Sequence, residues 1–312
     1  MRPAASLLLF TTLSGAGYGL LAVWALLGLA GVLPPEPLAG AVGLVPAILL
    51  IGGGLLASTF HLARPDRAWR AFSQWRTSWL SREAVAAVAT FAPALVLAFG
   101  WLLGGRVPPL AAFLSAAGAG LTVLCTGQIY ATLVPVPRWH QPLTTPVFLA
   151  MALASGATLA VLLTAALGSG TSAAGLTALV ALPLAWGLKL LWWRSGDRAP
   201  PRATAAAAIG LAGETPARLV EPAHSAGSWL LEETGFRVAR RHAARLRRLA
   251  LSFGLGLPWP LLALGLLAGG RWTLLLALPA VLAKALALAI ERWLFFAEAR
   301  HMVGLWYGEA AV

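Results

Sequence analysis

Residues 143–168 of the chain read LTTPVFLAMALASGATLAVLLTAALG, a stretch without a single charged side chain. A helix needs roughly 20 mainly apolar residues to cross the hydrocarbon core of a bilayer, because each residue adds only about 1.5 Å. The stretch is long enough for this, and it is too continuously apolar for a barrel strand, in which polar and apolar residues alternate. It is therefore predicted to span a membrane as one α-helix.

Similar stretches, separated by charged or proline-rich breaks, occur at residues 6–31, 40–62, 84–104, 109–133, 173–193, 250–269 and 272–296. Of the 312 residues, 59% are hydrophobic and only 11% are charged, whereas soluble globular domains have roughly 25% charged residues. These proportions exclude an ordinary soluble fold. The sequence predicts an all-α polytopic membrane protein, a bundle of eight transmembrane helices that forms one integral membrane domain over residues 1–312.

The positive charges are distributed unevenly between the two ends of this predicted bundle. The chain has 23 Lys and Arg against 11 Asp and Glu. Eight spans put both termini on one side, together with most of the arginines, and leave only Arg106 and Arg271 on the other. The positive-inside rule then places both termini in the cytoplasm. Because this topology accounts for the basic charge, no nucleic-acid partner is expected.

The loop at residues 194–249 is the only sizeable segment outside the predicted spans. Four prolines prevent a long helix in its first part: Pro200, Pro201, Pro216 and Pro222. Residues 236–250 place apolar side chains at helical spacing opposite arginines, which predicts a basic amphipathic helix that leads into the seventh span. Such a helix could lie on anionic lipid headgroups or dock an acidic partner subunit, and both remain open.

A few ionisable residues lie in or near the spans, where a charge is costly unless it is paired, hydrated or able to reach the interface. Lys284, Glu291 and Glu298 recur every seven residues, so they form one stripe of the last span, which should face the bundle or a water-filled cleft. Structural pairing and proton handling are both possible roles. Lys189 lies next to two tryptophans and is predicted to extend to the membrane interface.

The junction between the second and third spans holds the densest group of polar and aromatic residues. Pro65 is expected to end the second span, and Ser81 with Glu83 to begin the third. His61 and Glu83 should then face each other across one short connection. Three tryptophans and several arginines lie between them: Trp69, Trp75, Trp79, Arg64, Arg67, Arg70 and Arg76.

A histidine and a carboxyl group at this position suit the chemistry of a quinone. Reduction of a quinone takes up electrons and protons, so a site needs a donor to a carbonyl oxygen, a group that titrates near neutral pH and an apolar slot open to lipid. His61 could supply the first two, and Glu83 could pass the proton to water. Trp69, Trp75 and Trp79 could wall the slot. The residues alone equally allow an interfacial His61 that is merely hydrogen-bonded.

Metal centres are not expected in this chain. Its single cysteine, Cys125, cannot hold an iron–sulfur cluster or a thiolate zinc site. A transmembrane haem needs axial ligands from helices, usually paired histidines, and only His61 lies at the end of a predicted span. The sequence therefore predicts neither haem nor an iron–sulfur cluster.

Four motifs follow one another along most of the chain: Gly15-Ala16-Gly17; His61-Leu62-x-Arg64-Pro65-x-Arg67-Ala68 with Ser78-Trp79-Leu80-Ser81-Arg82-Glu83; Tyr130 with Val136-Pro137-x-Trp139; and Glu291-Arg292-Trp293-Leu294-Phe295-Phe296 with His301-Met302. In this order they resemble the DmsC family, the membrane anchors of dimethyl sulfoxide reductase-type molybdoenzymes. The long basic loop that ends at Arg248 looks more like the anchors of cytoplasmic sulfite dehydrogenases.

The resemblance implies a haem-free anchor in the bacterial inner membrane. Such an anchor exchanges electrons between a membrane quinone (menaquinone or ubiquinone) and a four-cluster iron–sulfur subunit. That subunit is attached to a molybdopterin catalytic subunit. The family residues that match His61 and Glu83 are associated with the quinol site. The chain is then not an enzyme on its own, and the substrate and the direction of electron flow depend on the catalytic subunit.

A chain without metal ligands can take part in electron transfer only if the quinone lies close to a cluster of the partner. The basic face near the quinone should therefore also dock the partner, with Arg64, Arg67, Arg70 and Arg76 as candidate contacts. Two other functions stay open. Glycine-rich spans together with Lys284 allow a secondary transporter, and the same bundle allows a structural anchor without a quinone site.

Overall fold

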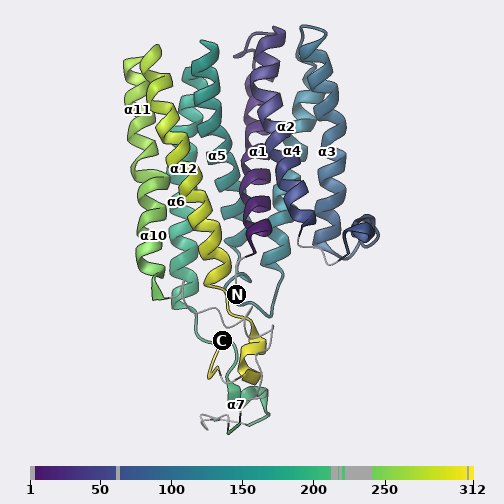
Figure 1. The fold of residues 1–312 in the computed structure, drawn as a ribbon, viewed down its shortest axis with the longest axis vertical. Helices are drawn as coiled ribbons and strands as arrows, with labels where there is room; N and C mark the ends of the chain where they lie inside the picture. Colours follow the sequence, from purple (N-terminus) through teal and green to yellow (C-terminus); the bar gives the residue numbers. More distant parts are fainter. Residues whose placement is uncertain (1–3, 61–63, 212–216, 218–219, 222–240, 308) are drawn as a thin grey trace.

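The computed structural model describes residues 4–60, 64–211, 217, 220–221, 241–307 and 309–312. These residues form a bundle of long helices that run side by side along one axis (Figure 1). Within the described ranges the only β pairing is one isolated bridge, between Thr204 and Ala311. The all-α class predicted from hydropathy is confirmed.

Eight helical segments of the described chain are long and apolar enough to cross a membrane: α1 (Ala5–Leu29), α2 (Pro37–Thr59), α3 (Trp79–Leu102), α4 (Pro109–Ala131), α5 (Thr144–Leu167), α6 (Thr171–Arg198), α10 with α11 (Ala243–Ala268) and α12 (Arg271–Ala297). They correspond one to one to the eight predicted spans, so the polytopic membrane fold is confirmed. Shorter elements connect or follow them: η1 (Pro65–Phe72), α7 (Ala205–Ala208) and η3 (Met302–Tyr307).

Some helix ends differ from the prediction. Helix α3 begins at Trp79, two residues before the expected start, because the Ser78 side chain caps it by accepting a hydrogen bond from the backbone N–H of Ser81. Helix α6 continues to Arg198, well beyond the predicted end at residue 193. Its last turns therefore carry charged residues past the apolar stretch.

The seventh span consists of two helices joined by a π-helical turn. Helix α10 (Ala243–Leu251) passes through the turn Ser252–Gly256 into α11 (Pro258–Ala268). Residues 236–240 of the predicted amphipathic helix lie outside the described residues. The described part of that helix, α10, carries three arginines and is continuous with the apolar span: Arg245, Arg247 and Arg248.

Helix α1 lies at the centre of the bundle and packs against α2, α4 and α5 (Figure 1). Its crossing with α5 is unusually close. A Cβ atom at Gly19 would overlap the backbone of Ala152, and one at Gly156 would overlap the backbone of Gly19 itself. Two glycines that face each other let two transmembrane backbones approach in this way. On the other side of α5, helix α12 packs against α5, α11 and α10.

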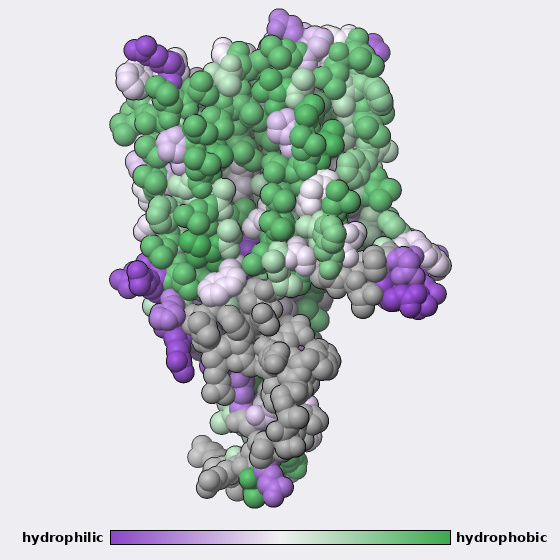
Figure 2. Space-filling view, in the orientation of Figure 1, coloured by the Kyte–Doolittle hydropathy of each residue, from purple (hydrophilic) through white to green (hydrophobic). Residues whose placement is uncertain are grey.

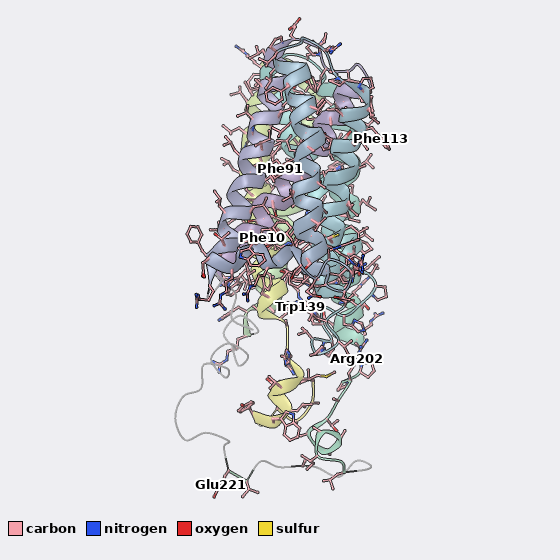
Figure 3. All side chains as sticks on the ribbon, turned by 90° about the vertical axis from the view of Figure 1, so that its right-hand side faces the viewer. Phe10, Phe91, Phe113, Trp139, Arg202 and Glu221 are labelled. Atoms are coloured by element: carbon pink, nitrogen blue, oxygen red, sulfur yellow. The ribbon has the colours of Figure 1, made fainter. Side chains whose placement is uncertain are left out.

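Both chain termini lie at the same end of the bundle (Figure 1). We term it the terminus end; there α1 begins at Ala5 and α12 ends at Ala297. The sides of the bundle are largely apolar, whereas hydrophilic residues gather at its two ends (Figure 2). Phe91 and Phe113 lie along the bundle, Trp139 lies at the terminus end, and Arg202 lies beyond it (Figure 3).

Candidate functional site

The predicted junction site is only partly described. His61 lies outside the described residues. The segment that follows it forms the short helix η1, which projects sideways from the terminus end beside α3 (Figure 1). The Arg64 guanidinium pairs with Asp66 at 3.1 Å. The four arginines proposed as docking contacts are all exposed: Arg64, Arg67, Arg70 and Arg76.

Two of the three tryptophans of the junction are exposed on the outside of the bundle. Trp69 and Trp75 are 66% and 52% exposed. The guanidinium carbon of Arg70 lies 5.6 Å from the Trp69 ring centroid, and Arg76 has the same distance to Trp75. Trp79, in the first turn of α3, is covered by Arg82 at 4.3 Å. Two of the three residues proposed as walls thus face outward.

Glu83, by contrast, is buried in the bundle. It lies in the second turn of α3 and is only 6% exposed. The Thr126 hydroxyl on α4 donates a short hydrogen bond to Oε1 of Glu83, and it also contacts the backbone carbonyl of Thr122. A carboxyl group inside a membrane bundle is costly and is rarely kept without a role. Glu83 is therefore the best supported chemical group of the predicted site.

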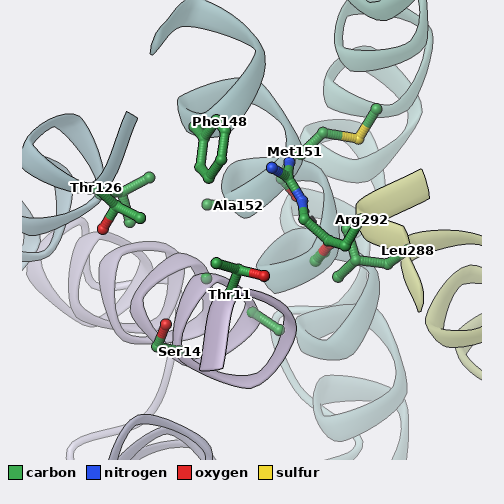
Figure 4. A pocket seen from close by; sticks show the side chains of 12 residues that line it. Thr11, Ser14, Thr126, Phe148, Met151, Ala152, Leu288 and Arg292 are labelled. Carbon is green, nitrogen blue, oxygen red and sulfur yellow. Dashed lines mark hydrogen bonds between the residues drawn. The ribbon is translucent and has the colours of Figure 1, made fainter. Parts of the chain in front are cut away.

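Thr126 also lines a small polar cavity between α1, α4, α5 and α12. Thr126 and Arg292 lie on opposite sides of this cavity, with Phe148 above and Thr11 and Ser14 below (Figure 4). The cavity volume is about 20 Å³, enough for roughly one water molecule. We name it the inner cavity. Thr126, which is hydrogen-bonded to Glu83, lines one side of the inner cavity, and the buried Arg292 of α12 lines the other.

Arg292 belongs to a buried ion cluster that connects α6 to α12. Its Nε atom lies 2.9 Å from Oε2 of Glu291, and its guanidinium carbon lies 3.9 Å from the Phe148 ring centroid. Its Nη1 atom is buried and has no hydrogen-bond partner among the described residues. Sequence reasoning overlooked Arg292, although an arginine inside an apolar span was itself a signal.

Lys189 is the third member of the cluster, and the prediction that it extends to the interface is wrong. Its side chain is completely buried, with Nζ 2.5 Å from Oε1 of Glu291 and 3.9 Å from the Trp192 ring centroid. The reason is the length of α6, because the helix continues for more than two turns beyond Lys189, to Arg198.

Lys284 lies deeper in the bundle and is 2% exposed. Its Nζ atom lies 3.6 Å from the sulfur of Met151 and 5.3 Å from the Trp186 ring centroid. Together with Lys189 and Arg292 it gives three buried cations, whereas Glu291 is the one carboxylate that pairs with two of them. The described interior near α12 therefore carries an excess of positive charge.

The stripe of Lys284, Glu291 and Glu298 reaches the terminus end at Glu298. There Glu298 pairs with Arg138 at 3.1 Å and with Arg247 at 2.7 Å. Asp197 pairs with the same two arginines, at 2.7 and 2.6 Å. These four side chains tie α6, α10 and α12 to the loop before α5. They line an open basin of about 640 Å³ at the terminus end.

An apolar cavity of about 210 Å³ lies between α1, α5 and α12. We name it the α1–α5–α12 cavity, and its lining includes Lys284. It shares three lining residues with the inner cavity: Ala16, Ser155 and Leu288. The sequence predicted an apolar slot beside the second and third spans instead. A cavity between α1, α2 and α3, lined by Tyr18 and Phe91, measures about 10 Å³, and the slot expected at the junction stays a prediction.

Metal-binding side chains do not gather in the described part of the chain. No group of three or more His, Cys, Asp or Glu residues there could hold a metal ion. Cys125 is buried on α4 as a free thiol. Among the described residues, the α1–α5–α12 cavity and the basin at the terminus end offer room for a ligand.

Two comparisons relate the chain to known proteins. Residues 1–214 match the family model described as DMSO reductase anchor subunit (DmsC). Over its full length, and over the full length of the relative, the chain is similar at 36% identity to a subunit of the sulfite dehydrogenase of Allochromatium vinosum. That second similarity extends over α10, α11 and α12, which the family model does not cover.

Proposed function

This chain belongs to the DmsC family, a family of membrane anchor subunits of oxidoreductases, and from this premise we propose that it is the quinone-reactive subunit of its complex. It exchanges electrons between membrane quinone and an iron–sulfur partner subunit, which is joined to a molybdopterin catalytic subunit. The full-length similarity to a sulfite dehydrogenase subunit supports sulfite as the substrate of the complex. Oxidation of sulfite to sulfate with one water releases two electrons and two protons, which reduction of one quinone takes up.

The observation that carries this proposal is the buried carboxyl group of Glu83. A bound quinone would supply a lipid-soluble carrier of electrons and protons. Glu83 can hold or release a proton close to the terminus end, while the Thr126 hydroxyl keeps one of its oxygens in place. In the sequence His61 lies between α2, which ends at Thr59, and η1, which begins at Pro65, and we propose it as the donor to a quinone oxygen. The residues present therefore fit a quinone site.

Partner docking is proposed at the terminus end, which we place in the cytoplasm of a bacterial inner membrane. The exposed arginines of η1 and its flanks supply positive charge for an acidic partner surface: Arg64, Arg67, Arg70 and Arg76. Trp69 and Trp75 are exposed in the same segment, so we propose that they lie at the membrane interface, where tryptophan is enriched, rather than in the quinone slot.

The test compares two isosteric changes in the assembled complex in nanodiscs. Glu83→Gln is expected to lower sulfite-dependent quinone reduction about 100-fold, which is within the range for loss of a general acid or base. Glu36→Gln, an exposed residue at the opposite end, should leave it unchanged. Sulfite-dependent reduction of ferricyanide, which takes electrons from the partner subunits, should be the same in both variants.

Each other outcome decides against a stated part of the proposal. Unchanged quinone reduction in Glu83→Gln would point to a structural anchor. Solute uptake by liposomes that contain this chain alone would point to a transporter. A complex that reduces dimethyl sulfoxide but does not oxidise sulfite would overturn the substrate and keep the quinone role.

A further inference from the structure

We infer that the α1–α5–α12 cavity is where the quinone enters the bundle from the bilayer and is first bound, on its way to the site of His61 and Glu83, with the ammonium group of Lys284 donating a hydrogen bond to one of its carbonyl oxygens. The inference rests on the proposed function and adds to it a place and a residue. It also separates two tasks within the bundle. Lys284 binds the quinone on entry, whereas His61 and Glu83 serve its reaction nearer the terminus end.

The shape and position of the cavity fit a lipid-borne ring. Its volume of about 210 Å³ exceeds the roughly 150 Å³ of an apolar cavity that holds benzene. Ala285 and Ala289 of α12 line it and are themselves exposed on the side of the bundle, as Leu13 of α1 and Leu50 of α2 are in part. The cavity therefore reaches the side of the bundle where α12 carries these exposed alanines. A ligand that enters there comes from lipid and not from water.

Lys284 is poorly satisfied by the protein around it. An ammonium group carries three N–H donors, and the partner of Nζ among the described residues is the sulfur of Met151, a weak acceptor. The hydroxyls of Ser155 and Thr158 also line the cavity, but each donates at 2.7 Å to a backbone carbonyl of its own helix. A buried donor without a good acceptor is costly. The arrangement calls for an oxygen supplied by a ligand.

The depth of Lys284 identifies the class of that ligand. Lys284 is the central residue of α12 (Arg271–Ala297), so about 20 Å of helix separate it from either end. Half of the hydrocarbon core is only about 15 Å thick, which keeps a phospholipid phosphate far from this lysine. A molecule that brings an oxygen acceptor to such a depth must be largely apolar and uncharged. A quinone, a ring with carbonyl oxygens on an isoprenoid chain, meets both conditions.

The cavity also leads towards the proposed proton-handling group. Its three residues shared with the inner cavity show that the two adjoin. Arg292 lines the inner cavity, eight residues or about 12 Å along α12 from Lys284, with a buried Nη1 that has no partner among the described residues. Thr126, the hydrogen-bond donor to Glu83, lines it too. Lys284 thus lies at the bundle centre, whereas Arg292 and Glu83 both lie nearer the terminus end.

The experiment uses photoreactive azido-quinone analogues, one with a benzoquinone and one with a naphthoquinone ring, added to the assembled complex in nanodiscs without native quinone. Peptides of α12 around residues 281–289, or the facing peptides of α1 and α5, are expected to carry the label. Lys284→Met, which keeps the length of the side chain and removes its donors, should lower the labelling at least about tenfold, the equivalent of roughly 1.4 kcal/mol.

A second pair of variants keeps the test decisive if Lys284→Met fails to fold, as judged by its thermal unfolding. Ala289→Leu fills the mouth of the cavity and should lower labelling without touching a charge. Ala89→Leu makes the same change at an exposed position of α3 and should have no effect. Full labelling of Ala289→Leu, or label found only on α2 and α3, would overturn the inference. So would labelling that a fatty acid displaces and unlabelled quinone does not.

Failure of this inference can be told from failure of the proposed function. If Lys284→Met and Ala289→Leu both retain full labelling while Glu83→Gln still abolishes quinone reduction, the quinone is held elsewhere and the function stands. If no part of the chain is labelled and Glu83→Gln reduces quinone at the normal rate, both are wrong.

Discussion

The ammonium nitrogen of Lys189 lies 2.5 Å from one carboxylate oxygen of Glu291, and neither side chain is exposed. The other oxygen of that carboxylate lies 2.9 Å from Nε of Arg292. One anion of α12 thus serves two cations, one from α6 and one from α12. Because the cluster is buried, water cannot replace a lost partner. Removal of the shared anion leaves two cations unpaired, whereas removal of one cation leaves the other pair intact, so the two changes should differ in their cost to stability.

Glu291→Gln is expected to destabilise the protein more than Lys189→Met does. Glutamine leaves both Lys189 and Arg292 buried without their anion, whereas loss of Lys189 leaves Glu291 paired with Arg292. Breaking a buried ion pair costs about 3–5 kcal/mol, and the glutamine variant should be at the upper end. Thermal unfolding of the purified protein measures both, with Glu36→Gln as an exposed control. Equal losses, or a greater loss in Lys189→Met, would contradict the shared-anion arrangement.

Gly19→Ala should impair folding, because the added methyl group would overlap the backbone of Ala152 on α5. Overpacking costs about 1–3 kcal/mol, and more where the obstacle is backbone. Gly15→Ala is the matched control on the same helix, since no atom of the neighbouring described residues lies within 4 Å of its added Cβ. The amount of folded protein recovered from membranes and its unfolding temperature test the pair. Similar behaviour of the two variants would mean that α1 and α5 do not cross at Gly19.

His61→Ala should abolish quinone-linked turnover and leave assembly of the complex intact, because we assign its imidazole to a quinone oxygen rather than to packing. A loss of about 100-fold or more is expected, as for the removal of a general acid or base. His242→Ala, at an exposed histidine just before α10, provides the control. Quinone reduction is measured together with co-purification of the partner subunits. Normal turnover in His61→Ala would remove this residue from the site.

Reporter fusions should place the terminus end in the cytoplasm. Alkaline phosphatase is active only outside the cytoplasm, so a fusion after Val312 is expected to be inactive. A fusion after Gly105, in the turn between α3 and α4 at the opposite end, should be active. The expectation follows from the positive-inside rule and the scarcity of arginine at that end. The reverse pattern of activities would invert the topology and move the docking face to the other side of the membrane.

The fold was predictable because membrane insertion is decided by local properties, namely the length and hydropathy of each stretch. The burial of Glu83 was not predicted, because the third span was expected over residues 84–104 and α3 begins already at Trp79. The environment of Lys189 could not be foreseen. It depends on α6 continuing through Arg194 to Arg198 and on Glu291 of α12 lying beside Lys189. Both features depend on how the helices pack and not on the local sequence. The position of the apolar cavity likewise depends on which helices are neighbours, and hydropathy says nothing about this.

The backbone contact between Gly19 and Gly156 has a consequence for the choice of quinone. Ala16 and Ser155, which lie close to these glycines on α1 and α5, belong to the wall of the α1–α5–α12 cavity, so this part of the wall is as rigid as the helix crossing itself. Helix α12 on the opposite side contains Pro279, which removes the backbone hydrogen bond to the carbonyl of Leu275, more than one turn before Lys284. If the proposed quinone binds here, a wider ring would be accommodated more easily by bending of α12 than by separation of α1 from α5. The preference for a benzoquinone, with one ring, or a naphthoquinone, with two, would then depend on how easily α12 bends.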